Sequence, residues 1–555
     1  MILDQINEIS EIFRYSLPYY LAILLPIMII LSPADAAHEF PVYRLQQFDL
    51  QGTKYGSRSA VLNFEARSVD TRLASRKCVI VMIDQFRSGR FQELLSEGVG
   101  AMLIVIPSDL EKLSDDLREQ ILDVERFLLA QEISIPVYFT PQTAYLDQIY
   151  EDIKESTSRD SAGSAAQALL GAVYASGYQL AVSGNQAKPL TDVQISNIQG
   201  KLAGFGMEEQ LATVAIIAHY DSFGAAPDLS FGGDSNASGV AALLELVRLF
   251  SRLASQPGQN GLARFNLVFA VTGGGKLNFL GSKKLLEDQL DSVDGGLFQE
   301  TAFVLCLDSI GKGQELNVHV SKPPKDGSNT AVFIERLQKL SSTLFPQVGV
   351  NMVHKKINLA GDFLSWEHER YSIRRLTAMT VSHYQNAKDS EHRGTLLDTK
   401  SSVDVAVLSR NVRLLAETLA SYLYNTTGPF FQGDLAVSEE MLNVWLTHLT
   451  SHPRSASILA SKGSNTVMSM LEKTLERYLK DVKVTHLSPD KREPEFVFYD
   501  QSKSLMTAYS VKPAVFDLFL TAIISAYLVV VYFGVQKFHW LYDVVATRTV
   551  KNKSS

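Results

Sequence analysis

The sequence contains little cysteine and no long run of positive charge. Its 555 residues include two cysteines, Cys78 and Cys306, so a small scaffold held by disulfides is excluded. Both lie within apolar runs, where a thiol packs as a small core residue. The formal net charge is −8, which makes nucleic acid a poor candidate for a direct partner. No internal repeat or low-complexity tract is present, so a repeat architecture is not indicated.

Apolar residues, in contrast, are plentiful. They make up 46% of the chain, and charged residues make up 20%. That balance supports large hydrophobic cores and argues against wholesale disorder. At roughly 150 residues per domain, the length allows about three or four domains.

The first long apolar segment predicts a signal peptide over residues 1–37. The apolar part of Leu17–Ala37 is about 15 residues long, the size of a signal-peptide core, and small residues follow it at the position of a cleavage site. The residues before it are more acidic than basic, which is unusual for such a segment. An uncleaved anchor is the alternative, although Pro18, Pro26 and the short length argue against it.

The second apolar segment predicts a transmembrane helix over residues 513–536. Leu518–Val535 carries no charge for 18 residues, enough to span a bilayer with flanking help. Basic residues dominate the tail, 537–555, which places the tail in the cytosol and the preceding bulk in the lumen or outside. The final "KNKSS" is similar to a dilysine retrieval signal of endoplasmic reticulum membrane proteins.

Residues 38–190 predict an α/β module. Short Val- and Ile-rich runs, "KCVIVMID", "GVGAMLIVIP" and "ISIPVYFT", alternate with helical stretches. The order resembles the protease-associated domain, a binding or lid module without chemistry of its own. The Ser-, Gly- and Ala-rich stretch 151–187 predicts a linker or an exposed excursion.

Residues 191–428 predict a doubly wound, mostly parallel α/β domain. "TVAIIA", "FNLVFAV" and "AFVLCLD" are apolar without alternation, as in parallel strands covered by helices on both faces. Such a sheet carries its site at the carboxyl ends of the strands. Residues 429–512 predict a helical extension, in which "EFVFYD" is a candidate strand.

Polar residues follow these strands. His219 and Asp221 follow the first, Asp308 ends the third, and His383 and His392 stand further along. Imidazole and carboxylate are ligands that Zn²⁺ takes in proteins, with a carboxylate orienting the histidine from behind.

The combination "AHYDS…GGDSNASG…VTGGGKLNFLGS…LCLDSIG" resembles the dizinc aminopeptidase family over about residues 195–425. The resemblance implies a zinc ligand at His219, an orienting carboxylate at Asp221, a bridging carboxylate at the place of Ser235, a general base at the place of Gly275, and further zinc ligands at the places of Lys276, Asp308 and His383, or less surely His392. We call the first seven of these positions, up to and including His383, the degenerate site.

Three of these positions have lost their chemistry. Ser235 is neutral where two metal ions need a bridging anion. Lys276 places a cation where a negative ligand belongs, and Gly275 has no side chain to deprotonate a water. We therefore predict no catalytic residue, no bound metal and no cofactor.

Two hypotheses about the remaining residues stay open. One mononuclear zinc held by His219, Asp308 and His383 is the alternative to an empty site. The second hypothesis concerns Lys276, whose ammonium could replace the lost metals as the counter-charge of Asp308. A lysine that points to solvent is the alternative to it.

Length, cysteine content and the motifs resemble, within this family, the nicastrin-like, non-catalytic nicalin family. That resemblance implies a scaffold subunit of an endoplasmic reticulum membrane complex, single-pass type I with a large lumenal domain. The implied partners are a nodal modulator protein, a small multi-pass membrane protein and the translocon with its ribosome, during multi-pass membrane protein insertion. A lumenal peptide or substrate receptor of nicastrin type is the alternative. Of two lumenal glycosylation sequons, we favour Asn425, because a glycan on Asn236 would obstruct folding of the degenerate site.

Overall fold

The computed structural model describes residues 37–71, 74–159, 177–207, 211–256, 265–290, 300–361, 363–386, 393–426, 428–460, 466–511, 514–537 and 540. Nearly all of the predicted signal peptide (1–37) and of the predicted cytosolic tail (537–555) lies outside these residues. His392 lies outside them as well.

The amino-terminal module is built on a closed barrel. Its strands are β1 (His38–Arg44), β4 (Leu62–Ser68), β5 (Cys78–Met82), β6 (Ala101–Ile106), β8 (Val137–Pro141), β9 (Gly177–Val182) and β19 (Lys503–Val511). They follow the order β1-β19-β9-β4-β5-β6-β8, and β1 also pairs with β8. The helices are α3 (Ser88–Ser96), α4 (Asp115–Leu129) and α5 (Ala144–Arg159). β5, β6 and β8 pair in parallel, as the three apolar runs separated by helical stretches predict.

The barrel is closed by a strand from the other end of the chain. β19 pairs antiparallel with β1 on one side and β9 on the other, with Phe40 opposite Met506. Met506 and Ala508 face the barrel core, whereas Leu505 and Tyr509 on the other face of the strand are exposed.

The predicted helical extension, 429–512, is therefore only half helical. It begins with α12 (Glu439–Leu449), α13 (Ala456–Leu459) and α14 (Thr466–Tyr478), and it continues as β17 (Lys480–Leu487), β18 (Phe496–Phe498) and β19. The candidate strand "EFVFYD" is confirmed as β18. Each of the three strands belongs to a different sheet. This region therefore joins the amino-terminal module to the body formed by residues 191–428, rather than extending one of the two.

The second body holds an eight-stranded sheet in the order β15-β14-β16-β13-β11-β12-β10-β17. Its strands besides β17 are β10 (Ile195–Leu202), β11 (Ala212–His219), β12 (Phe265–Thr272), β13 (Thr301–Leu307), β14 (Glu315–Val320), β15 (Gly349–His354) and β16 (Ala378–Ser382). The predicted parallel pairing of the three apolar runs is confirmed, because β11 lies parallel between β12 and β13. β14 runs antiparallel to β16, and β15 pairs in parallel with β14.

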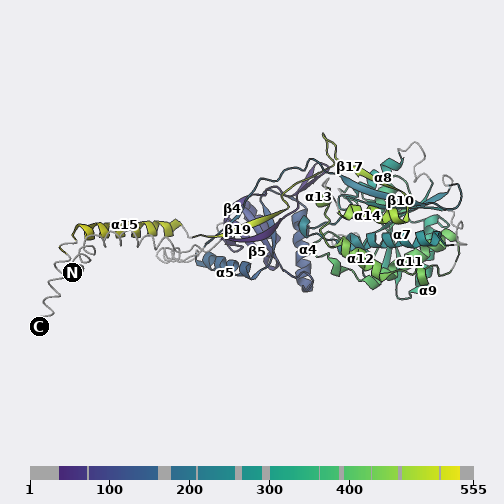
Figure 1. The fold of residues 1–555 in the computed structure, drawn as a ribbon, viewed down its shortest axis with the longest axis horizontal. Coiled ribbons are helices and arrows are strands. Elements are labelled where there is room, and N and C mark those ends of the chain that lie inside the picture. Colours follow the sequence, from purple (N-terminus) through teal and green to yellow (C-terminus); the bar gives the residue numbers. More distant parts are fainter. Residues whose placement is uncertain are drawn as a thin grey trace, which may run out of the picture.

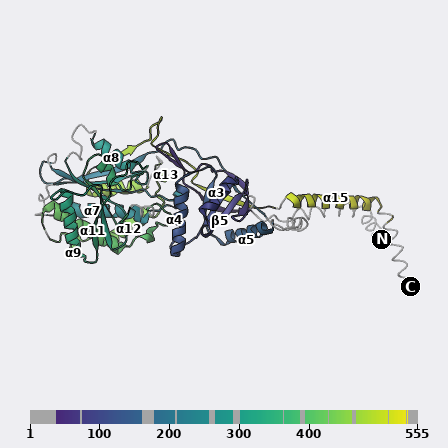
Figure 2. The same ribbon diagram turned by 180° about the vertical axis from the view of Figure 1, so that it is seen from behind.

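Helices cover both faces of this sheet (Figures 1 and 2). One face packs against α7 (Gly239–Ala254), α9 (Asn329–Leu344), α11 (Val405–Tyr424), α12 and α14, and the other against α8 (Leu280–Leu290) and α10 (His368–Ile373). Neighbouring residues of β11 alternate between the two cores, with Ile216 in the first and Ile217 in the second. A strand buried on both faces must be apolar throughout, which explains the runs without alternation.

A small sheet connects the two bodies. It has the order β18-β2-β3-β7, where β2 is Phe48–Leu50, β3 is Thr53–Ser57 and β7 is Glu132–Ile133. Its core includes Phe48 and Phe496 from the two ends of the chain and Leu277 from the loop after β12. The loop of the degenerate site is thereby packed against the amino-terminal module.

The last described helix, α15 (Ala514–Gln536), extends away from both bodies (Figure 1). Large apolar side chains along it are exposed, among them Leu518, Ile523 and Val530. Among the described residues, no helix meets the combined requirement of length and apolarity for crossing a membrane. The transmembrane helix at 513–536 therefore stays a prediction.

Candidate functional site

The degenerate site forms at one edge of the eight-stranded sheet. His219 ends β11, the turn with Gly275 and Lys276 follows β12, and Asp308 follows β13. His383 follows β16, and the backbone of that residue is hydrogen-bonded to the segment after β13. Since these strands are parallel, their carboxyl ends meet at one edge and bring the predicted residues together.

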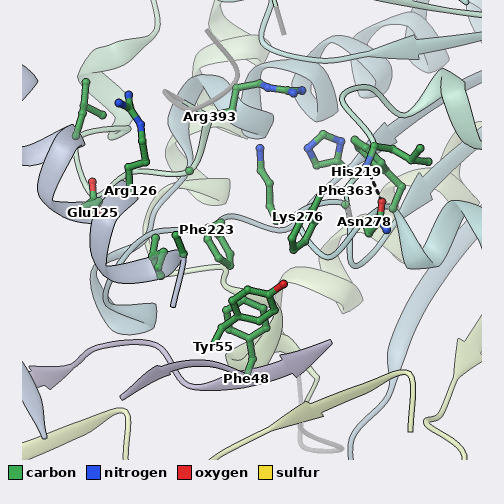
Figure 3. Close-up of a pocket in the computed structure, with 17 residues that line it drawn as sticks. Phe48, Tyr55, Glu125, Arg126, His219, Phe223, Lys276, Asn278, Phe363 and Arg393 are labelled. Carbon is green, nitrogen blue, oxygen red and sulfur yellow. Dashed lines mark hydrogen bonds between the residues drawn. The ribbon is translucent and has the colours of Figure 1, made fainter. Parts of the chain in front are cut away.

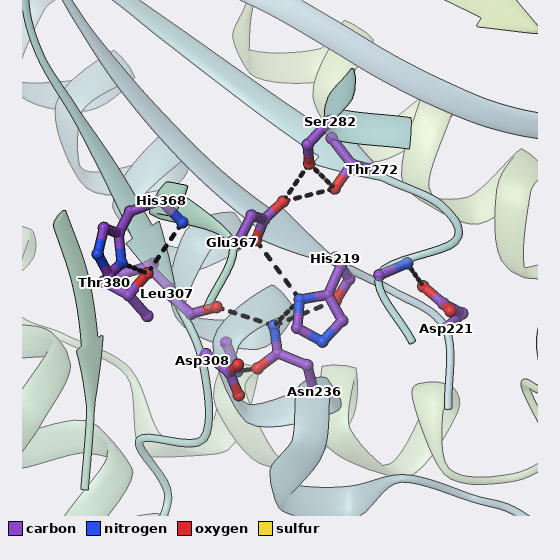
Figure 4. A network of polar contacts seen from close by, with 12 residues as sticks. His219, Asp221, Asn236, Thr272, Ser282, Leu307, Asp308, Glu367, His368 and Thr380 are labelled. Atoms are coloured by element: carbon purple, nitrogen blue, oxygen red, sulfur yellow. Dashed lines mark hydrogen bonds and ion pairs between the residues drawn. The ribbon is translucent and has the colours of Figure 1, made fainter. Parts of the chain in front are cut away.

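His219 is buried and contacts a glutamate that sequence reasoning missed (Figure 4). Its Nδ1 lies 3.5 Å from Oε2 of Glu367. The other oxygen of Glu367 accepts hydrogen bonds from the hydroxyls of Thr272 at 3.0 Å and Ser282 at 2.5 Å. The carboxylate behind this histidine is thus Glu367, from "WEHERY", and no family motif marks that segment.

Asp221 does not orient His219, contrary to the expectation. Its two carboxylate oxygens accept the backbone N–H groups of Gly275 at 2.7 Å and Lys276 at 3.1 Å. The carboxylate therefore fixes the turn after β12, in which Gly274 has the left-handed φ of 63°. Asp221 therefore binds backbone N–H groups, whereas the resemblance implied that it would orient the zinc ligand His219.

Gly275 leaves no room for a side chain. A Cβ atom built on it would lie 2.3 Å from Cγ of His219. The imidazole thus fills the space into which a base at this position would project. Reintroducing a glutamate here requires His219 to move first.

Lys276 points into the degenerate site and donates from its ammonium to the hydroxyl of Ser235. Burial lowers the pKa of Lys276 to about 8, with the charge of Asp308 acting in the opposite direction. The Ser235 N–H is held in turn by Asp398 Oδ2 at 2.8 Å. The two residues that stand in place of metal ligands thus bind each other.

Asp308 has a counter-charge that the sequence hypothesis did not name. Its Oδ2 forms an ion pair with Arg393 Nη1. Arg393 lies over the ring of Trp366, with Cζ 4.2 Å from the ring centroid, and donates to Ser365 O at 2.6 Å. Burial alone would raise the pKa of Asp308, but the charges of Arg393, His219 and Lys276 hold it well below its usual range. Arg393, rather than Lys276, is therefore the direct partner of Asp308.

His383 is also engaged, because its Nε2 lies 2.8 Å from Oδ2 of Asp234. The three residues that could together hold one zinc ion therefore each have a different partner. Asp308 is paired with arginine, His383 is paired with Asp234, and His219 contacts Glu367. Over the described residues, no group of three or more His, Cys, Asp or Glu side chains has an arrangement that could hold a metal. The residues present do not fit the metal that the resemblance implies.

The two glycosylation sequons differ in access. Asn236 is fully buried, and its amide donates to Leu307 O at 2.8 Å and His219 O at 3.1 Å. A glycan on it is incompatible with this packing. Asn425 is exposed at the end of α11, where its Oδ1 accepts from Arg336 at 2.6 Å. Its glycosylation stays a prediction.

A cavity of about 460 Å³ opens onto the degenerate site from between the two bodies (Figure 3). His219, Lys276 and Arg393 line it at one side, and α4 lines it at another. Aromatic rings supply much of the remaining wall, namely Phe48, Tyr55, Phe223, Phe279 and Phe363. No sequence pattern points to Phe48 and Tyr55, because these rings come from strands of only three and five residues in the connecting sheet.

The two bodies are joined beside this cavity by Glu125 of α4. Its carboxylate accepts the N–H groups of Ala225 at 2.9 Å and Leu396 at 3.1 Å, and the hydroxyl of Thr395. Burial raises the pKa of Glu125 to about 7, although these donors oppose the shift. The amino-terminal module is therefore hydrogen-bonded directly to two loops that flank the degenerate site.

Comparison with known proteins places this geometry in a family. Residues 197–418 match the family described as Peptidase family M28. The BOS complex subunit NCLN of Rattus norvegicus is 44% identical over 567 residues, covering 100% of both chains. Nicalin of Caenorhabditis elegans is 28% identical, covering 95% of this chain and 96% of its own. The chain belongs to the nicalin family.

The fold has a counterpart among solved structures. The crystal structure of the gamma-secretase component nicastrin aligns with a TM-score of 0.57 at 12% identity. The alignment covers 85% of this chain and 99% of the nicastrin chain. The resemblance to the nicalin family and the nicastrin-like α/β fold are thus confirmed.

Proposed function

We propose that this protein is a non-catalytic scaffold subunit of an endoplasmic reticulum membrane complex that associates with the translocon during multi-pass membrane protein insertion. The observation that carries the first part is the mutual pairing within the degenerate site. Lys276 binds Ser235, Arg393 binds Asp308, and the imidazole of His219 fills the place of a side chain at position 275. In a site whose charged groups are paired with one another, no side chain is left to hold a metal ion and the water that the metal would activate.

The second part of the proposal draws on the relatives and on the sequence. The mammalian relatives are named as subunits of the BOS complex, and we extend membership of such a complex to this chain. A nodal modulator protein and a small multi-pass membrane protein are the proposed partners, with the ribosome-bound translocon as the associated machine. α15 and the basic tail support a type I orientation, with both bodies and Asn425 in the lumen.

Metal content and turnover test the absence of catalysis. The full-length protein, purified in detergent without chelator, is analysed for zinc by mass spectrometry and for release of amino acids from aminoacyl anilides. We expect zinc well below one ion per chain and no turnover above that of a heat-denatured sample. Stoichiometric zinc accompanied by turnover would instead support the mononuclear peptidase.

Membrane association is tested with a tagged full-length chain and a chain that ends after residue 511. We expect the full-length chain to resist extraction by alkaline carbonate and to co-purify with multi-pass membrane proteins and ribosomes. The shortened chain should be extracted and should lose these partners. Equal behaviour of the two chains would contradict the anchoring role of residues 514–555.

A nicastrin-type receptor for lumenal peptides is a second candidate function, favoured by the aromatic cavity above the degenerate site. Phe48, Phe223 and Phe363 offer the apolar wall on which peptide side chains bind. Substituting Phe363 by Ser would impair client binding under this function and would leave complex assembly unchanged. Photo-crosslinking from position 363 distinguishes the receptor from the scaffold, because a protein that acts only as a scaffold gives no peptide adduct there.

A further inference from the structure

A second cavity lies at the opposite edge of the eight-stranded sheet from the degenerate site. Its volume is about 750 Å³, and the ends of β14 and β15, the beginning of β16 and the beginning of α9 contribute to its wall. The reason is topological. β14 runs antiparallel to β16, so Val320 at its end lies opposite Met379 at the beginning of β16. Reversal of strand direction thus creates another set of strand carboxyl ends, the kind of position where α/β sheets bind ligands.

Two residues in the wall of this cavity carry buried hydroxyl groups. The side chains of Ser321 and Thr330 are 7% and 3% exposed, and neither hydroxyl has a hydrogen-bond partner among the described residues. Both residues line the cavity. A buried polar group without a partner costs about 1–3 kcal/mol, so native structures rarely keep one. A ligand with acceptor oxygens would satisfy both donors.

Basic side chains line the same cavity. The basic residues that line the cavity are Lys322, Lys325, His354, Lys356 and Arg375, all on exposed segments. In the described part of the chain, no acidic residue lines the cavity, and none of its lysines or Arg375 takes part in an ion pair. The cavity therefore carries positive charge that the protein itself leaves unbalanced.

The beginning of α9 adds a third type of donor. The helix runs for 16 residues from Asn329, and Ser328 caps it by accepting the N–H of Ala331 at 3.4 Å. The first N–H groups of any helix lack intrahelical acceptors, and the helix dipole makes this end positive. Ser328 and Thr330 both line the cavity, so the amino terminus of α9 adjoins the hydroxyls and the cations.

We propose that this cavity binds a phosphate-bearing small molecule. Hydroxyl donors, helix amides and several cations together match the many acceptor oxygens and the multiple charge of a phosphoryl group. The volume falls within the range of small-molecule sites. Exposed lysines alone would suit any anion, but the two buried hydroxyls select a ligand that reaches the inner wall with oxygen atoms.

Calorimetric titration of the full-length chain in detergent micelles tests the proposal. The probes are inorganic phosphate, pyrophosphate and phosphatidylinositol phosphate incorporated into the same micelles, which separate free from lipid-borne phosphate. We expect saturable binding of at least one probe, weakened about tenfold or more by Thr330→Val, since one hydrogen bond to a charged group is lost. Arg375→Ser should weaken it similarly, whereas Lys339→Ser on the exposed side of α9 should not.

The Thr330→Val variant should fold normally, because a hydroxyl without a partner is replaced by a methyl group of the same shape. An unchanged melting temperature therefore accompanies the loss of binding. Absence of saturable binding to all three probes up to about 10 mM would overturn the proposal. So would unchanged affinity of Thr330→Val, or binding of an octaglutamate peptide in place of every phosphate probe, which would assign the cavity to an acidic protein segment.

Discussion

At the scale of single residues, the degenerate site is a set of buried charges that balance one another. Asp308 is fully buried, and Arg393 supplies its ion pair. Lys276 is a second cation at the site, but its hydrogen bond goes to Ser235. We therefore expect the two cations to contribute unequally to folding, although both stand where the family holds metal charge.

We expect Arg393→Met to destabilise the protein by about 3–5 kcal/mol, the usual range when one member of a buried ion pair is removed. Lys276→Met should change the free energy of unfolding by about 1 kcal/mol or less, because loss of the bond to Ser235 is offset by removing a buried charge. Urea denaturation of both variants measures the difference.

Asp308→Asn provides the control for this comparison, because it removes the charge that Arg393 balances. Combining it with Arg393→Met should recover part of the lost stability. Equal effects of Arg393→Met and Lys276→Met would show that the two cations share Asp308 and would return Lys276 to the role that the sequence suggested.

Gly275 carries a steric prediction. Gly275→Ala should destabilise by about 1–3 kcal/mol, since the new methyl group overlaps the ring of His219. Gly89→Ala in α3 is the matched control, because a Cβ there meets nothing within 4 Å, and alanine is the better helix former. A melting temperature for Gly275→Ala equal to that of wild type would mean that His219 moves freely.

Sequence reasoning located this site but not its internal contacts. The positions of Ser235, Gly275 and Lys276 follow from the motif residues beside them, which needs only local information. Arg393 and Glu367 were missed because their partners lie 85 and 148 residues away. No periodicity or spacing encodes a contact at such separation, so only the fold reveals it.

At the scale of elements, buried and exposed side chains alternate along β19, and this alternation determines how much each side chain contributes to the stability of the barrel. Met506→Ala should destabilise the amino-terminal barrel by about 2–5 kcal/mol, since its side chain is 0% exposed in the core. Leu505→Ala on the neighbouring position should cost about 0.5 kcal/mol or less, as this side chain is 57% exposed. The measurement is the rate of protease cleavage within residues 38–182, which rises when the barrel opens. Equal cleavage rates for the two variants would contradict the register of β19 in the barrel.

The difference between predicted and missed strands follows from the same alternation. β11, β12 and β13 are buried on both faces, so their apolar runs predict strands without knowledge of partners. β19 leaves Leu505 and Tyr509 on its exposed face, so its sequence shows no clean alternation of apolar and polar residues. β17 directly follows α14, and "KDVKVTHL" resembles a helix end as much as a strand. Their pairing with distant strands, rather than their composition, makes them strands.

At the scale of the whole molecule, Glu125 predicts a pH-dependent junction between the two bodies. Its folded pKa of about 7 lies above the unfolded value of 4.5. The stability it contributes is therefore fully present below about pH 4.5 and is lost as pH rises to about 7, by roughly 3 kcal/mol. Glu125→Gln cannot ionise and should lack this loss.

The measurement is the free energy of unfolding of wild type minus that of Glu125→Gln at pH 5, 6, 7 and 8. Burial lowers the pKa of His319 to about 4 and of His368 to about 3, which gives an opposite slope in acid. That slope is common to both proteins and cancels in the difference. A difference that stays constant from pH 5 to 8 would show that Glu125 is ionised throughout.

The barrel closed by β19 also fixes an order of events during synthesis. Arg44 donates to Gln501 O, 457 positions later in the chain, and translation at about 5–20 residues per second takes roughly 20–90 s to cover that distance. Until then β1 and β9 lack the strand that lies between them. The module made first is consequently the last to be completed. Its open strand edges stay available to chaperones, or to another nascent chain, for most of the time the ribosome spends on this protein.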